Sequence, residues 1–296
     1  MPANCMRRLV LAGIILGISA YTAVAAQTLD AIAQKGTIRI GYISDEEPFS
    51  SKRKDGTPSG YAIDLCGKIA DAVGTKVANL KRDYVETTLA DGFDAVKGGQ
   101  IDLLCGALTI NLARRQSVDF SQPIFLTGAS ALLRKDSPDY LRALFLDRIT
   151  TQVSAKPAPA TSAIGVRADT TTDATLREAL GPNIPKTRIA TFATHQDGLN
   201  ALEDHKIDAY FADRALLFDL ASHARKPATL VIGNRLFTHE PYGIALRQDD
   251  SAFRLLVDQT LTATYQSDDF DKLLTSYFGE ESPILRREIM MQSIPQ

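Results

Sequence analysis

The sequence QIDLLCGALTINLARRQSVDFSQP, residues 100–123, decides the fold. Its first part, Ile101–Leu108, is apolar and predicts a buried strand, which a polar turn and a short helix with two arginines follow. Thr109 lies at the carboxyl end of this strand, and Arg114 comes five positions later, so its guanidinium can turn back toward the same point. Ligands bind at this edge of open α/β sheets. A hydroxyl, free backbone groups and a guanidinium there suit a carboxylate.

The composition is that of a globular protein. The chain has 296 residues, of which 45% are hydrophobic, and its formal net charge is −2. This length is enough for one large or two modest domains with a sizeable core. The nearly balanced charge gives no electrostatic reason to expect nucleic acid or an anionic membrane as a partner.

The first residues have the pattern of a secretory signal peptide. Arg7 and Arg8 form a basic region, an apolar run extends from Leu9 to about Ala20, and Ala23-Val24-Ala25 is a cleavage signal. A membrane anchor is the alternative, but the apolar run is shorter than the ~20 residues that cross a bilayer. We therefore expect residues 1–26 to be removed and the mature protein to be exported to the periplasm.

Two cysteines remain after that removal, Cys66 on a predicted helix and Cys105 on the strand that this helix could cover. An even pair in an exported chain suggests one disulfide, with two buried free thiols as the alternative. No histidine stands at ligand spacing to either cysteine, so we expect no metal site there.

Strands and helices alternate along the chain, and the pattern restarts after a loop at 150–162 that is rich in Thr, Ser, Ala and Pro. Strands are predicted at 37–42, 101–108, 163–166, 186–190, 207–211 and 240–246. Helices are predicted at 62–73, 93–98, 173–180, 196–204, 215–223, 251–265 and 268–277. This order predicts an α/β protein with two units of similar build.

Four segments in order resemble the extracellular solute-binding proteins of family 3, which take up polar amino acids. They are residues 60–65 (GYAIDL), 100–123, 208–213 (DAYFAD) and 240–243 (EPYG). The resemblance covers about Leu29 to Gly279. It implies the type II periplasmic-binding-protein fold, with two α/β lobes joined by a double-crossover hinge. Lobe one would hold residues 27–125 and 238–296, and lobe two residues 126–237.

The same resemblance implies how an amino acid would be held. Arg114 would bind its α-carboxylate, helped by the hydroxyl or backbone N–H of Thr109, and the carbonyl of Ala107 would accept from its ammonium group. Asp213 ends a lobe-two strand and would supply the anionic partner for that ammonium group. The alternative is that Asp213 caps the N-terminus of the following helix.

The turn before a lobe-two helix is a further predicted contact. Thr170 and Thr171 could offer backbone N–H groups to an anion. The family usually has glycine before this pair, and this chain has Asp169, whose carboxylate could repel an anion.

Specificity is left open by the remaining candidates. A histidine like His195 helps hold the side-chain carboxylate in the glutamate/aspartate branch of the family, but Ile43 and Gly92 stand where that branch has further cations. Glu46 stands where many relatives have an aromatic residue; if its side chain points into the cleft it would favour a basic or polar ligand over an acidic one, with a solvated surface glutamate as the alternative. Leu89 and Phe49 could supply apolar walls, with core packing as the equal alternative.

The predicted function is that of a monomeric periplasmic binding protein that delivers an amino acid to the permease of an ABC importer. We expect no cofactor and no enzymatic activity. Two alternatives remain: a cyclohexadienyl or arogenate dehydratase of the same fold, with Glu46 or His195 as general acid, and an accessory protein that presents a ligand to a receptor.

Overall fold

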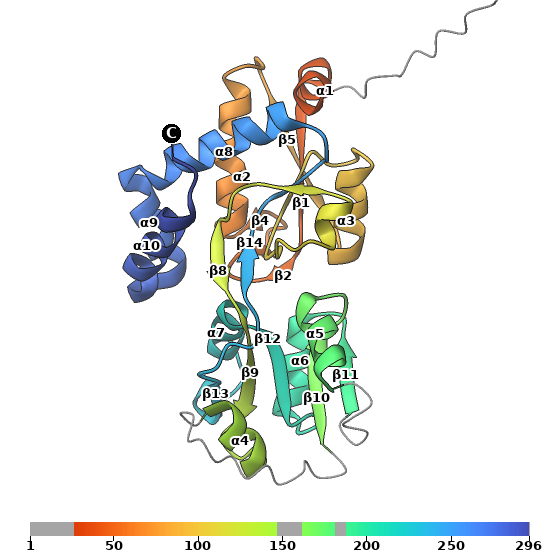
Figure 1. Cartoon of the computed structure of the whole chain (residues 1–296), viewed down its shortest axis with the longest axis vertical. Helices are drawn as coiled ribbons and strands as arrows, with labels where there is room; N and C mark the ends of the chain where they lie inside the picture. The colour runs from red at the N-terminus through yellow and green to blue at the C-terminus, as the bar shows by residue number, and fades with distance from the viewer. Residues whose placement is uncertain (1–26, 147–161, 181–187, 296) are drawn as a thin grey trace, which may run out of the picture.

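The computed structural model describes residues 27–146, 162–180 and 188–295, which form two α/β lobes, one above the other in Figure 1. Each lobe is built on a five-stranded sheet with helices packed against it. The predicted two-lobed α/β fold is therefore confirmed. The predicted signal peptide and residues 150–161 of the predicted loop lie outside the described residues.

The sheet of lobe one contains β1 (Thr37–Tyr42), β5 (Lys81–Glu86), β6 (Leu103–Cys105), β7 (Asp119–Phe120) and β15 (Ala245–Leu246). The strand order is β5-β1-β6-β15-β7. β1 runs parallel to β5 and β6, and β15 runs antiparallel to β6 and β7. The central strands are buried on both faces because helices cover them, which is why β6 is continuously apolar.

The helices of lobe one are α1 (Thr28–Lys35), α2 (Tyr61–Gly74), α3 (Leu89–Lys97), α8 (Ser251–Tyr265), α9 (Asp268–Phe278) and α10 (Ser282–Gln292), with the short helices η1 (Arg114–Gln116) and η3 (Gly279–Glu281). The α2 helix packs against β1, β6 and α8, and α3 packs against β6 and β15. Cys66 of α2 and Cys105 of β6 are joined as a disulfide in this structure.

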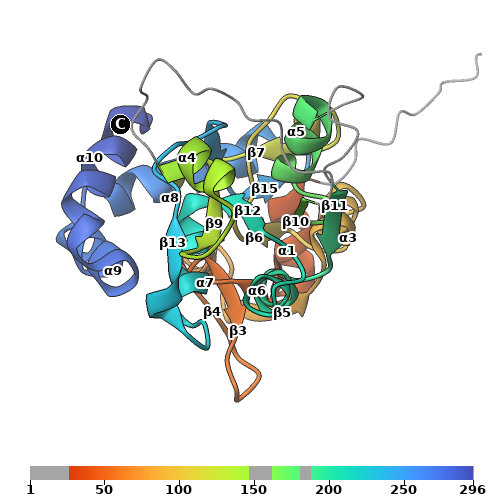
Figure 2. The same ribbon diagram turned by 90° about the horizontal axis from the view of Figure 1, so that it is seen from below.

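The sheet of lobe two has the strand order β11-β10-β12-β9-β13. Its strands are β9 (Ala129–Arg134), β10 (Ala163–Arg167), β11 (Arg188–Phe192), β12 (Ala209–Asp213) and β13 (Leu230–Ile232). Its helices are α4 (Asp139–Leu146), α5 (Thr171–Leu180), α6 (His195–Glu203), α7 (Arg214–Ser222) and η2 (Pro227–Thr229). Seen end-on in Figure 2, α6 and α7 lie on one face of this sheet, and α4 and α5 lie on the other.

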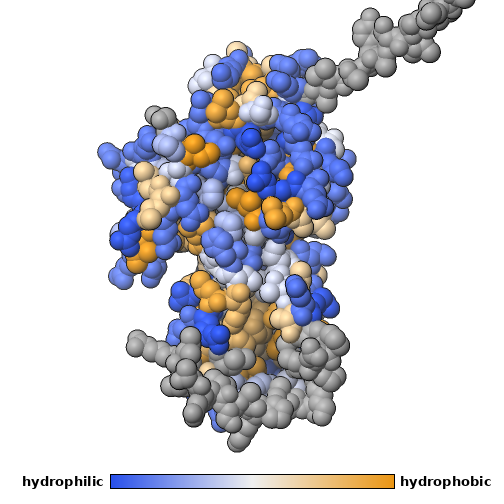
Figure 3. All heavy atoms as spheres, viewed as in Figure 1, coloured by the Kyte–Doolittle hydropathy of each residue, from blue (hydrophilic) through white to orange (hydrophobic). Residues whose placement is uncertain are grey.

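Two antiparallel strands connect the lobes, β8 (Phe125–Thr127) and β14 (Glu240–Tyr242). The chain thus crosses between the lobes twice, and the molecule narrows at this level in the space-filling view (Figure 3). A small sheet of β2 (Asp45–Glu46), β3 (Ser50–Lys52) and β4 (Pro58–Ser59) projects from lobe one, and β2 lies against α6 of lobe two.

Several predicted elements differ in extent from the observed ones. The strand predicted at 101–108 is ordered as β6 only over Leu103–Cys105, because the chain then turns and Thr109 pairs with Tyr242 at the lobe connection. The α3 helix begins at Leu89 rather than Phe93, since the Thr88 hydroxyl caps it by accepting from the backbone N–H of Asp91. Within the described residues, no helix combines the length and apolar character that a membrane span requires.

Candidate ligand-binding site

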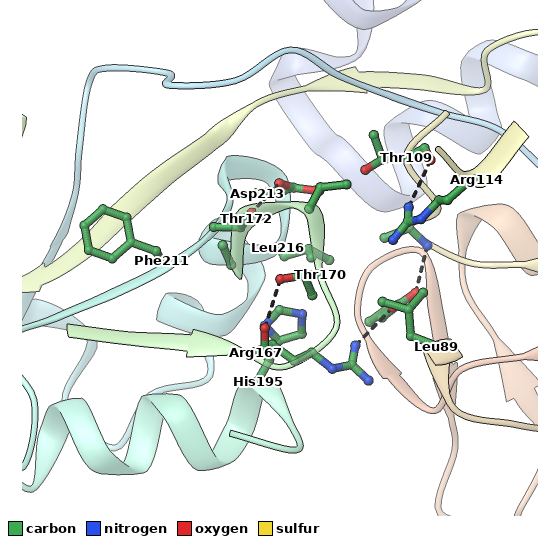
Figure 4. Close-up of a pocket in the computed structure, with 14 residues that line it drawn as sticks. Leu89, Thr109, Arg114, Arg167, Thr170, Thr172, His195, Phe211, Asp213 and Leu216 are labelled. Carbon is green, nitrogen blue, oxygen red and sulfur yellow. Dashed lines mark hydrogen bonds and ion pairs between the residues drawn. The ribbon is translucent and has the colours of Figure 1, made fainter. Parts of the chain in front are cut away.

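A cavity lies between the facing ends of the two lobes (Figure 4). The space between its walls, counted together with the part open to solvent, is about 360 Å³. From lobe one it is lined by Glu46, Leu89, Ala107, Thr109 and Arg114, and from lobe two by Arg167, Thr170, Thr171, Thr172, His195, Phe211, Ala212, Asp213 and Leu216. Within the described residues no group of His, Cys, Asp or Glu side chains could hold a metal ion.

Arg114 is positioned by the short helix that follows β6. Its backbone N–H donates to the Asn111 side chain at 2.8 Å, and its Nη1 donates to the Thr109 carbonyl at 2.9 Å. The guanidinium also lies over the Phe93 ring, 4.8 Å from its centroid. Burial lowers the pKa of Arg114, and the Glu46 carboxylate opposes this change. An arginine stays protonated under these conditions, so the cavity contains a fixed cation.

Asp213 enters the cavity from the end of β12. Its carboxylate accepts hydrogen bonds from the Tyr242 hydroxyl and, at 3.4 Å, from the Thr172 hydroxyl. Burial, together with the nearby Glu240 carboxylate, raises the pKa of Asp213 to about 7. A cation placed beside Asp213 would favour the ionised form. Asp213 and Arg114 therefore place an acidic and a basic side chain in the same cavity from opposite lobes.

Glu46 and Arg167 meet across the same cavity. The Nη1 atom of Arg167 donates to Oε1 of Glu46 at 3.0 Å, and Oε2 of Glu46 accepts from the Ala107 backbone N–H at 2.8 Å. The Nη2 atom of Arg167 donates to Oδ1 of Asp45 at 2.7 Å. Burial raises the pKa of Glu46, and the Arg167 guanidinium opposes that rise. These ion pairs join β2 of lobe one to β10 of lobe two.

His195 is the first residue of α6 and is buried beside Arg167. Its Nδ1 lies 2.9 Å from the Tyr210 hydroxyl, and its backbone N–H donates to Oδ2 of Asp45 at 3.2 Å. Burial, helped by the Arg167 charge, lowers the pKa of His195 to about 3. The imidazole is therefore neutral near pH 7 in the ligand-free protein.

The threonines at the start of α5 have partners within the protein. The Thr170 hydroxyl donates to the Arg167 carbonyl at 2.9 Å, and the Thr171 hydroxyl donates to the Glu240 carboxylate at 2.9 Å. Asp169 has a φ of 63°, the left-handed region where glycine is favoured and Asp is tolerated. This explains why the residue before the threonine pair departs from the family pattern without breaking the turn. Asp169 does not line the cavity.

The structure brings together all but one of the predicted ligand-binding residues. Phe49 is the exception: its ring is fully buried in an aromatic cluster with Tyr61, Phe125 and Tyr242 and does not line the cavity. Phe49 therefore packs in the core, which was the alternative to its prediction as an apolar wall of the ligand site. Arg167 was not predicted from the sequence, because its partner Glu46 lies 121 positions away and neither belongs to a motif.

A family model described as bacterial extracellular solute-binding proteins, family 3, matches residues 38–280. The chain is 30% identical over 261 residues to the L-glutamate/L-aspartate-binding protein of Pseudomonas aeruginosa, covering 86% of this chain and 81% of that protein. It is 27% identical over 286 residues to the glutamate/aspartate import solute-binding protein of Escherichia coli K12, covering 95% and 89%.

Solved structures are similar as well. One is an ancestral amino acid-binding protein, AncCDT-1, described as a precursor of cyclohexadienyl dehydratase; it has a TM-score of 0.70 at 28% identity, covering 86% of this chain and 100% of that chain. Another is an ancestral arginine-binding protein bound to glutamine, with a TM-score of 0.67 at 24% identity, covering 83% and 99%. The second likeness bears on the fold alone.

Proposed function

The chain belongs to the bacterial extracellular solute-binding proteins of family 3, and we propose that it binds an α-amino acid between its lobes and delivers it to the permease of an ABC importer. One observation carries this proposal. Arg114 of lobe one and Asp213 of lobe two line a single cavity, so a cation and an anion face the same small space. An α-amino acid carries the complementary pair of charges on one carbon atom.

The residues around the cavity would contact the two charged groups of the amino acid in different ways. A guanidinium binds a carboxylate through two parallel hydrogen bonds, which is strong in a cavity that excludes water. Asp213 would accept from the ammonium group, and Thr109 and Ala107 would add a hydroxyl and backbone groups on the lobe-one side. The N–H groups of Thr170 and Thr171 at the start of α5 would complete the carboxylate site.

The remaining features of the proposal concern the exported protein. We propose that residues 1–26 are a cleaved signal peptide and that the mature protein acts in the periplasm as a monomer. An oxidising compartment suits the Cys66–Cys105 pair. We place lobe one at residues 27–125 and 238–296 and lobe two at 126–237, since β8 and β14 connect the two sheets at these points.

Binding rather than catalysis suits the groups beside the charged pair. A dehydratase would need a general acid that carries a proton at working pH. His195 does not carry that proton near pH 7, because burial holds its pKa at about 3. Both carboxylate oxygens of Glu46 already accept hydrogen bonds from N–H groups. The named relatives above are likewise binding proteins.

A thermal-shift screen of the mature protein tests the proposal. The ligands are the twenty amino acids, small dicarboxylates and prephenate. A ligand that binds only the folded state raises the melting temperature, so we expect a clear rise with at least one amino acid. A rise with prephenate alone, accompanied by formation of an aromatic product, would instead establish the enzyme. No rise with any amino acid would contradict the proposed function.

A further inference from the structure

The charged groups of the cavity divide into two pairs. Arg114 and Asp213 complement the α-carboxylate and α-ammonium groups that every amino acid carries. The other charged groups that line the cavity are Glu46 and Arg167, with His195 neutral beside them. Any polar group on the ligand's side chain would therefore face Glu46 and Arg167. This inference rests on the proposed function and concerns the class of amino acid.

The Arg167 guanidinium is fixed from outside the cavity. Its Nη2 donates to Asp45 at 2.7 Å, and its Nε donates to the Ala193 carbonyl at 3.3 Å. Asp45 does not line the cavity, and its second oxygen accepts from the His195 backbone. A guanidinium has five N–H donors, so donors remain beyond these contacts and the one to Glu46. Figure 4 shows the Arg167 side chain extending into the cavity.

Glu46 supplies the acceptors at the same place. It is only 2% exposed, and Arg167 is 6% exposed, so both charges are removed from water. Each carboxylate oxygen of Glu46 makes one hydrogen bond, to Ala107 or to Arg167, and can accept another. Within the cavity lining, Glu46 and Arg167 carry one charge of each sign and present donors and acceptors side by side, while the Asp45 carboxylate pairs with Arg167 from outside that lining. A charged side chain placed here would leave a buried charge without a counterion, which is costly.

We propose that Glu46 and Arg167 together select an amino acid whose side chain is neutral and ends in a carboxamide, glutamine or asparagine. The carbonyl oxygen of a carboxamide accepts from Arg167, and its NH₂ group donates to Glu46. A ligand carboxylate would meet the Glu46 charge, and a ligand cation would meet the Arg167 charge. Sites that hydrogen-bond both parts of a ligand group discriminate strongly against analogues that satisfy only one of them.

Calorimetric titrations of the mature protein with glutamine, asparagine, glutamate, aspartate, lysine and arginine test this selection. We expect a carboxamide to bind at least about tenfold more tightly than any charged amino acid. Glu46→Gln leaves Arg167 with one carboxylate fewer and should shift the preference toward glutamate or aspartate. Arg167→Gln leaves Glu46 without its cation and should shift the preference toward lysine or arginine. A purely structural role would not move the order in opposite directions.

The matched control is Glu47→Gln, which removes a neighbouring carboxylate that does not line the cavity and should keep the wild-type order. Circular dichroism checks the fold of each variant, and Glu46→Gln alone decides the matter if Arg167→Gln does not fold. A wild type that prefers a charged amino acid overturns the inference but leaves the proposed function standing. An unchanged order in Glu46→Gln also overturns it. A folded wild type that binds no amino acid overturns both.

Discussion

Arg114 is the residue that we propose as the partner of the ligand's α-carboxylate. We expect Arg114→Ala to weaken amino-acid binding by about 2–4 kcal/mol, because a buried ligand carboxylate would lose its cation. Isothermal titration of the preferred ligand measures this loss. Arg115→Ala is the matched control: its side chain is half exposed and pairs with Asp119, so affinity should hardly change. Equal affinities in the two variants would remove Arg114 from the site.

If Asp213 is the partner of the ligand's ammonium group, as we propose, binding should depend on pH. Its pKa is about 7 in the ligand-free protein, because burial and Glu240 disfavour its charge. A ligand ammonium group would lower that pKa, so binding at pH 7 should release protons. Affinity should be highest above pH 7 and fall as the pH drops below it, by up to about tenfold per unit.

Calorimetry in two buffers of different ionisation enthalpy measures the proton release. Asp213→Asn should bind more weakly and lose this part of the pH dependence. If the number of protons released at pH 7 is the same in the wild type and in Asp213→Asn, the ammonium contact is assigned to the wrong carboxylate.

His195 gives the stability of the fold a dependence on pH. Its pKa is about 3 in the folded protein and near 6.5 when unfolded, so unfolding takes up a proton between these values. The contribution of His195 to the free energy of unfolding should therefore fall by up to about 1.4 kcal/mol per unit as the pH drops from 6.5 toward 3, while Asp213, with its raised pKa, contributes in the opposite direction. Urea titrations at several pH values measure this slope. We expect the free energy of unfolding of His195→Gln to depend less steeply on pH in this direction. An unchanged dependence would mean that another group takes up the proton.

The sequence could predict a residue of the cavity only where the position of that residue at or after a strand end indicates where it lies in the fold. Arg114 comes after β6 of lobe one and Asp213 ends β12 of lobe two, and ligands bind at the carboxyl ends of strands in such sheets. Arg167 also ends a strand, but its role depends on Glu46 from the other lobe, and the approach of the two lobes leaves no local pattern. Phe49 could have faced either way, because an aromatic residue in a short hairpin fits a core or a cavity equally well.

At the scale of elements, the disulfide fixes α2 to β6. It joins positions 39 residues apart, and a crosslink of this span restricts the unfolded chain. We expect the Cys66→Ala, Cys105→Ala double variant to lose about 2–4 kcal/mol of unfolding free energy. Thermal melts with and without reductant measure the effect. The wild type should become less stable when reduced, whereas the double variant should not respond, and a wild type insensitive to complete reduction would contradict the prediction.

Elements with strong periodicity were predicted within a residue or two. β1 and α8 have the predicted bounds, because each has an unbroken pattern between clear end signals. β5 was not predicted: it is an edge strand with largely exposed side chains, so its sequence, KRDYVE, has no apolar run. The three short strands β2, β3 and β4 are too brief for any period to show. Their pairing depends on the turn at 53–57 and on contact with lobe two.

At the scale of the whole molecule, the two lobes are joined by more than their connecting strands. The carboxylates of Asp45 and Glu46, on β2 of lobe one, accept hydrogen bonds from lobe two. The donors are the Arg167 guanidinium and the His195 backbone N–H. Glu46, Arg167 and His195 line the cavity, and Asp45 contacts two of them from outside the lining. A residue that selects the ligand would therefore also affect how closely the lobes approach one another.

Arg167→Gln should make the ligand-free protein more open, because it removes the ion pairs that cross from Asp45 and Glu46 to lobe two. Small-angle X-ray scattering should show a larger radius of gyration than for the wild type, and a saturating ligand should reduce it again, since the ligand contacts both lobes. Arg39→Gln is the matched control: it removes an ion pair with Asp102 inside lobe one and should leave the dimensions unchanged. If both variants scatter like the wild type without ligand, the crossing ion pairs do not set the opening of the lobes.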